Sequence, residues 1–125
     1  VGDDVEACAE PLRGYTALYV GGMGSREKNF YNQLARRMGF EDAAAEVQDL
    51  FLQKKHREAM AAVPLELIDQ TSLIGPPERI VERLHAYAES GVTTLNVSCF
   101  DDSTEGRIAT LRTMAEALES SGLGT

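Results

Sequence analysis

Residues 21–28 contain the side chains best suited to hold an anion. Gly21-Gly22-Met23-Gly24-Ser25 is rich in glycine, and Arg26 and Lys28 follow it. A glycine-rich turn that enters a helix offers free N–H groups, and the helix dipole also favours negative charge. This stretch joins two predicted helices, so neither the dinucleotide-binding nor the P-loop context is met. From the residues alone we favour a plain helix stop and start, with Ser25 as the next cap.

A second polar group lies on a predicted strand at residues 92–99. Its even positions, Thr94, Asn96 and Ser98, are polar and its odd positions are largely apolar. This alternation is typical of a strand covered on one side. Asn96 and Ser98 could line a barrel interior beside a pocket. The same pattern fits an edge strand that faces water, and the residues leave both interpretations open.

The other polar candidates form no catalytic or metal-binding set. Asp101 and Asp102 follow the strand, at the edge where α/β folds bind ligands, but we favour a solvated loop that caps the next helix. His56 and His85 have no partner at ligand spacing on their own helices. No Cys–His or Ser–His–Asp arrangement can be assembled. The sequence therefore predicts no metal site, and it leaves the catalytic residues unassigned.

Helices account for nearly all of the remaining predicted structure. An N-terminal helix capped by Asp3 is interrupted at Pro11, whose ring removes a backbone donor. Apolar spacings of three and four predict further helices over about 26–38, 41–53, 54–62, 65–70, 76–90 and 104–119. The strand at 92–99 has no predicted partner, although its backbone groups need one. We therefore expect the chain to be a piece of a larger protein.

Composition and charge exclude several classes of protein. The apolar fraction of 43% and the charged fraction of 26% are ordinary for a globular domain. The net charge of −8 argues against nucleic acid and anionic membranes as partners, because both select basic surfaces. No apolar run approaches the roughly 20 residues of a membrane-spanning helix, and no signal peptide is recognised. Cys8 and Cys99 are expected to be reduced thiols in the cytoplasm, with one disulfide between them as the alternative.

Two stretches of the chain resemble one known family. Residues 73–97, LIGPPERIVERLHAYAESGVTTLNV, resemble the last helix–strand unit of the bacterial luciferase-like (β/α)8 enzymes. Residues 19–40, YVGGMGSREKNFYNQLARRMGF, are similar to the branch of oxidoreductases that uses the deazaflavin coenzyme F420. The two stretches occur in the order and spacing of that family, and the resemblance extends over nearly the whole chain.

The resemblance implies an α/β fold in which this chain is the C-terminal fragment of a TIM (β/α)8 barrel. The fragment would be mostly helical as it stands, with one clear strand at about 92–99. Residues 1–70 would be a helical segment inserted over the barrel mouth, and residues 71–125 the last helix–strand–helix units. The implied chemistry is hydride transfer between F420 and a small organic substrate. Most cofactor contacts of the family come from units absent here, which implies an inactive isolated chain.

The resemblance gives this chain binding residues but no catalytic residue. The cofactor-binding candidates are Gly24, Ser25, Arg26 and Lys28, which would contact the phosphate tail or a substrate, and the pocket-lining candidates are Asn96 and Ser98. We expect a cytoplasmic homo-oligomer with F420, or alternatively FMN, as cofactor and with no metal. The alternative functions are an FMN-dependent luciferase-like monooxygenase and a non-enzymatic helical module that binds a protein partner.

Overall fold

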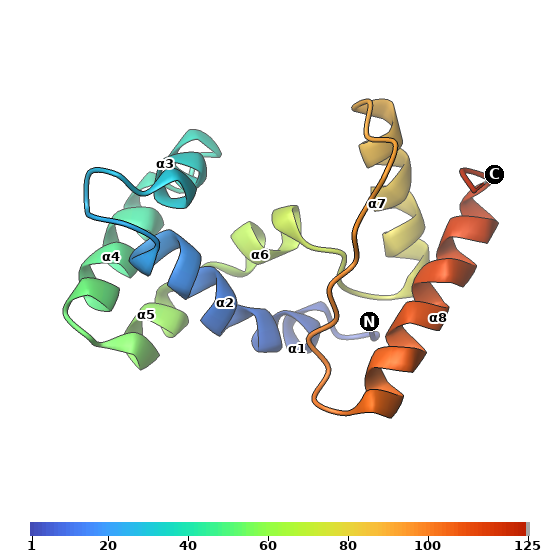
Figure 1. Cartoon of the computed structure of the whole chain (residues 1–125), viewed down its shortest axis with the longest axis horizontal. Coiled ribbons are helices and arrows are strands. Elements are labelled where there is room, and N and C mark those ends of the chain that lie inside the picture. The colour runs from blue at the N-terminus through green and yellow to red at the C-terminus, as the bar shows by residue number, and fades with distance from the viewer. Residues whose placement is uncertain (125) are drawn as a thin grey trace. The chain divides into compact units, whose positions relative to one another are not determined.

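The computed structural model describes residues 1–124, in which the elements are helical (Figure 1). In chain order they are α1 (Val5–Ala9), a 3-10 segment η1 (Glu10–Leu12), α2 (Arg13–Ala17), a π-helical segment η2 (Leu18–Gly22), α3 (Phe30–Arg37), α4 (Glu41–Leu52), α5 (His56–Ala62), α6 (Leu65–Thr71), α7 (Pro77–Glu89) and α8 (Thr104–Ser121). None of the helices within residues 1–124 has the length and apolar character needed to cross a membrane.

The helices group into two compact units. One unit is formed by residues 9–72, and the other by residues 1–8 together with the residues from Leu73 onward.

The first helix begins one residue later than the sequence predicted. Asp4 Oδ1 accepts hydrogen bonds from the N–H groups of Glu6, at 3.0 Å, and Ala7, at 3.2 Å. The capping residue is therefore Asp4 and not Asp3, because a cap must reach the N–H groups two and three positions ahead of it. Pro11 lies in the 3-10 segment η1, which confirms the predicted interruption.

The unit of residues 9–72 packs α4 against α3, α5 and η2. Its buried apolar side chains include Ala17, Val20, Ala35, Ala44, Val47, Ala59, Val63, Leu67 and Ile68. Small side chains at several of these positions allow the short helices to approach one another closely. The apolar spacing that predicts the helix over about 26–38 includes Phe30, but Phe30 is 61% exposed, whereas α3 buries Asn32 and Ala35.

In the other unit, α7 begins and ends where local sequence signals place it. Pro77 occupies the first turn, and Gly91 follows the helix with a φ of +92°. The N–H of Gly91 donates to the carbonyl of Ala88, at 3.0 Å, and that of Val92 donates to the carbonyl of Tyr87, at 3.1 Å. These two bonds form a Schellman motif, so the predicted end of this helix near residue 90 is confirmed.

The predicted strand at residues 92–99 is not confirmed. No residue from 1 to 124 is in a β-strand, and this segment runs from the end of α7 to the loop before α8 without regular structure (Figure 1). Strand geometry is maintained by hydrogen bonds to a neighbouring strand. The described residues contain no second strand, so the alternating pattern has nothing with which to pair.

The unit that contains α7 and α8 has a sparse core. Ile74, Ile80 and Ala117 are buried, and α7 packs against α8. The apolar residues whose spacing predicts α8 are left partly uncovered, with Ile108 51% and Leu111 48% exposed. An amphipathic helix gains most of its stability by burying such a face. The apolar side chains of α8 could therefore pack against a larger core than the described residues form.

Candidate functional site

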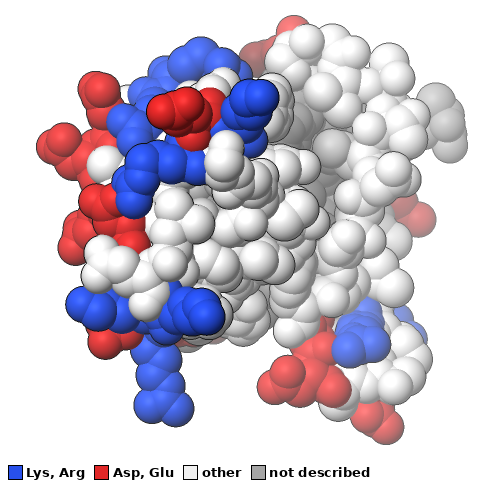
Figure 2. Space-filling view, turned by 60° about the vertical axis from the view of Figure 1, so that its left-hand side comes forward, with Lys and Arg blue, Asp and Glu red and all other residues white. Residues whose placement is uncertain are grey.

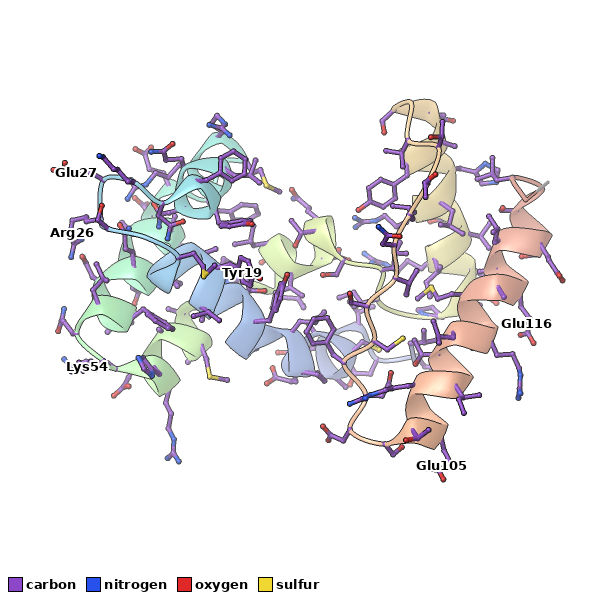
Figure 3. The ribbon with its side chains drawn as sticks, in the orientation of Figure 1. Tyr19, Arg26, Glu27, Lys54, Glu105 and Glu116 are labelled. Atoms are coloured by element: carbon purple, nitrogen blue, oxygen red, sulfur yellow. The ribbon has the colours of Figure 1, made fainter. Side chains whose placement is uncertain are left out.

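The candidate anion-binding residues lie on the loop that joins η2 to α3, in the unit of residues 9–72 (Figure 3). Ser25 does not cap the helix as predicted. α3 begins four residues beyond that position, and its cap is Asn29, whose side-chain oxygen accepts from the N–H of Asn32 at 3.0 Å. Ser25 instead accepts, through its carbonyl, the N–H of Lys28 at 3.0 Å in a turn. Ser25 and Arg26 therefore do not lie at the start of a helix, where the helix dipole would favour an anion.

Two buried asparagines fix the end of this loop. Asn29 Nδ2 donates to the carbonyls of Tyr19, at 3.0 Å, and Val20, at 3.1 Å. Asn32 Nδ2 donates to the carbonyls of Val20, at 3.0 Å, and Ala44, at 2.8 Å. Neither side chain is among the site residues predicted from the sequence. Their three-residue spacing and the preference of Asn for helix caps were the available signal.

The double glycine of η2 is explained by its packing against α4. A Cβ added to Gly21 would lie 2.6 Å from Phe51 Cβ, and one added to Gly22 would lie 2.4 Å from Phe51 Cε1. Side chains do not fit at these distances, so glycine permits Phe51 to lie directly on the turn. Single π-helical turns occur frequently at functional sites. Here the turn sets the point at which the chain enters the candidate loop.

Gly24 is needed for the closure of the loop itself. It has a φ of +136°, and a Cβ at this position would lie 2.3 Å from the carbonyl oxygen of Lys28. Buried Gln48 on α4 donates through Nε2 to the carbonyl of Arg26 at 3.2 Å. The loop is therefore held in one shape by contacts within its own unit.

The charges of the loop are only partly available to a ligand. Arg26 forms an ion pair with Asp49 on α4, whereas within residues 1–124 neither the Lys28 ammonium nor the Ser25 hydroxyl has a partner. Both of these side chains are exposed. Figure 2 shows basic and acidic side chains interspersed on this side of the chain, without a continuous basic surface. Lys28 and Ser25 fit one end of an anionic group, and they are too few to hold a whole cofactor.

The pocket-lining candidates lie in the other compact unit of the chain. Asn96 and Ser98 lie in the unstructured segment between α7 and α8 and are exposed. They belong to the unit that includes Leu73 and later residues, whereas the loop belongs to the unit of residues 9–72. Their place in a barrel interior stays a prediction.

Asp101 and Ser103, in the loop after this segment, bond to the first turns of α8. Asp101 Oδ2 accepts from the hydroxyl of Thr110 at 2.9 Å, and its carbonyl accepts from Arg107 Nε at 2.9 Å. Ser103 Oγ accepts from the N–H of Gly106 at 3.0 Å and is the N-cap. The loop interpretation favoured from the sequence is therefore confirmed for Asp101.

A row of aromatic rings, Tyr15, Tyr19, Tyr31 and Phe30, lies in the same unit as the loop; we call it the aromatic cluster. The ring centroids are 4.4 Å apart for Tyr15–Tyr19, 4.7 Å for Tyr19–Tyr31 and 5.5 Å for Phe30–Tyr31. A side-chain hydrogen bond to Tyr19, assisted by burial, raises the pKa of Tyr15 above its ordinary value of 10.0. Tyr15 and Tyr19 lie four residues apart, a spacing that predicts one helical face and does not by itself predict an exposed ring cluster.

Comparison with known proteins identifies the family of the chain. Residues 1–94 match the model of the luciferase-like monooxygenase family. A putative coenzyme F420-dependent oxidoreductase of Mycobacterium tuberculosis (strain ATCC 25618 / H37Rv) is 33% identical over 96 residues, which are 77% of this chain and 28% of that protein. The chain thus spans less than a third of the length of this curated relative, and no solved structure matches it. The family inferred from the sequence is confirmed, and the chain belongs to the luciferase-like monooxygenase family.

Proposed function

We propose that the intact protein is an oxidoreductase that transfers a hydride between coenzyme F420 and a small organic substrate. The observation that carries this proposal is the 33% identity to a relative named as F420-dependent, in addition to the family match over residues 1–94. The family implies a TIM barrel. The chain covers only part of one, so we propose that it is inactive by itself and that its catalytic residues lie elsewhere in the intact protein.

The role that we propose for this chain is to hold one end of the cofactor. F420 supplies the hydride chemistry when it is bound. The Lys28 ammonium and the Ser25 hydroxyl are exposed and free to contact its anionic tail. Arg26 shares its charge with Asp49 and contributes less, and Gly24 maintains the shape of the loop. We propose that Asn96 and Ser98 line the floor of the barrel pocket in a cytoplasmic homo-oligomer.

Cofactor identity is tested by titrating the intact protein with F420 and with FMN under equilibrium dialysis. We expect saturable binding of F420 and much weaker binding of FMN. Preference for FMN would instead support a flavin-dependent monooxygenase, the second candidate, which the family description favours. The isolated 125-residue chain is the control. Tight, stoichiometric F420 binding by this chain would contradict the proposal that most of the site lies elsewhere.

The role of the loop is tested with Lys28→Gln in the intact protein. Removing one exposed cation from a phosphate contact is expected to weaken F420 binding about twofold to fivefold, and the difference should shrink at high salt. Lys55→Gln is the matched control, because Lys55 is also exposed but lies at the start of α5. Equal effects of the two substitutions would show that Lys28 contributes only general charge and does not contact the cofactor.

A further inference from the structure

The backbone of the loop at residues 23–28 is held by side chains of α3 and α4. The carbonyl of Arg26 accepts a hydrogen bond from Nε2 of Gln48, at 3.2 Å, and Gln48 is only 1% exposed. The carbonyl of Glu27 accepts from Nε2 of Gln33 on α3, at 3.3 Å. Both donors belong to the same compact unit as the loop. The backbone of Arg26 is therefore fixed by α4, whatever its side chain binds.

The side chain of Arg26 is held by a different kind of contact. Its guanidinium forms an ion pair with the carboxylate of Asp49 on α4, and the two side chains are 57% and 51% exposed. Exposed ion pairs contribute little to stability, because water solvates both charges when they separate. A guanidinium binds phosphate and carboxylate oxygens through the same paired N–H groups. A phosphate group can therefore replace the Asp49 carboxylate at little cost.

Two consecutive residues of α4 make these two contacts. Adjacent residues of a helix point in different directions, so Gln48 is buried while the Asp49 side chain is half exposed. The Arg26–Asp49 pair joins residues 23 positions apart, and it places a carboxylate beside the loop that also carries Lys28. This negative charge weakens the attraction of the loop for an anion, because it neutralises the guanidinium and repels the anion itself.

We propose that Asp49 is a counter-ion that pairs with Arg26 until the anionic tail of the cofactor displaces it, and that Asp49 thereby sets the affinity of the loop for its anion. This inference rests on the proposed function, because it names a residue that regulates the cofactor contact proposed for Lys28 and Ser25. It concerns binding alone and adds no step to the hydride transfer. Lys28 then attracts the anion from the start, and Arg26 binds it only after leaving Asp49.

The test measures anion binding by the intact protein in equilibrium dialysis at low salt, where exposed charges are least screened. The probes, used in separate experiments, are F420 and inorganic pyrophosphate. Asp49→Asn should tighten the binding of both about twofold to fivefold, because Arg26 no longer has to leave a carboxylate. In an Arg26→Gln background the same substitution should tighten binding by less than about 1.5-fold. Glu41→Gln is the matched control. It also removes a carboxylate from an arginine of this unit, Arg36, at 4.0 Å, and should leave both affinities unchanged.

The counter-ion role and the proposed function fail through different results. The role of Asp49 is overturned if Asp49→Asn does not tighten binding, if the gain persists in the Arg26→Gln background, if Glu41→Gln gives an equal gain, or if neither probe binds. Pyrophosphate binding that follows the expected pattern, without F420 binding, supports the counter-ion and refutes the proposed cofactor. F420 binding that is unchanged in Asp49→Asn refutes the counter-ion alone. The Asp49 side chain is half exposed, so the variant should keep the circular dichroism of the parent.

Discussion

The contact between η2 and α4 predicts a large effect for a very small substitution, Gly21→Ala. Gly21 is buried, and an added Cβ would lie 2.6 Å from Phe51 Cβ and 3.2 Å from the carbonyl oxygen of Val47. Neither atom is at the end of a flexible side chain. The added methyl group can therefore be accommodated only if the backbone of η2 or of α4 moves.

The expected magnitude follows from two opposing effects. Over-packing of a close-packed site costs about 1–3 kcal/mol, whereas the change from glycine to alanine in a helix gains about 0.5–1 kcal/mol. Gly14→Ala in α2 is the matched control, because its Cβ would lie 3.5 Å from Met60 Cε, an ordinary contact. We expect Gly21→Ala to lower the free energy of unfolding by about 1–2 kcal/mol. Gly14→Ala should raise it by about 0.5–1 kcal/mol.

Urea unfolding followed by helical circular dichroism measures both changes. With a slope of about 1–3 kcal/mol per molar urea, a loss of about 1–2 kcal/mol should lower the Gly21→Ala midpoint by roughly 0.3–2 M. The Gly14→Ala midpoint should rise by a smaller amount. If both variants are stabilised equally, or if Gly21→Ala leaves the midpoint unchanged, Phe51 does not require glycine at this turn and the packing argument is refuted.

Three further predictions concern the loop and its neighbours. Asn32→Leu removes the two buried hydrogen bonds that Asn32 donates to the carbonyls of Val20 and Ala44. It should lower the free energy of unfolding by about 2–4 kcal/mol in the same urea assay. An effect below about 1 kcal/mol would show that these two bonds contribute little to stability. Lys54 has a φ of +63°, so Lys54→Gly should raise the free energy of unfolding by about 0.5–1 kcal/mol. Lys55→Gly is the control, because Lys55 has an ordinary φ of −89°, and this substitution should lower the free energy of unfolding. The raised pKa of Tyr15 means that its contribution to stability is complete below the pKa of the unfolded chain and is lost as pH rises through the folded value. Tyr19→Phe should move that pKa back toward 10.0 in a spectrophotometric titration, and an unchanged titration curve would exclude the hydrogen bond as its cause.

Local signals in the sequence were sufficient for several helix boundaries. Pro77 and Gly91 bracket α7 as predicted, and Pro11 marks the interruption of the first helix. These residues act through their own backbone geometry, which depends little on the rest of the molecule. The capping role of the loop before α8 was recognised for the same reason.

The candidate site was only partly predictable. The loop that contains Gly24 and Lys28 could be recognised by composition, but its glycines were interpreted as an anion cradle or as a helix boundary. In the structure they serve the approach of Phe51 and the closure of the loop. That distinction depends on Phe51 of α4, which lies more than twenty residues away in sequence. Asn29 and Ser25 were both acceptable caps by type, and burial of the Asn29 side chain decided between them.

The sequence by itself determined that the chain is helical, where most helices begin and end, and to which family it belongs. Each of these depends on local backbone preferences or on matched residues. Only the tertiary structure decided which side chains are buried, why Gly21 and Gly22 are required, and that residues 92–99 form no strand within residues 1–124. Burial and strand pairing both depend on segments that are distant in sequence. A pattern of apolar and polar residues shows that a segment could form a strand or a buried face, but it does not provide the second segment with which to pair or pack.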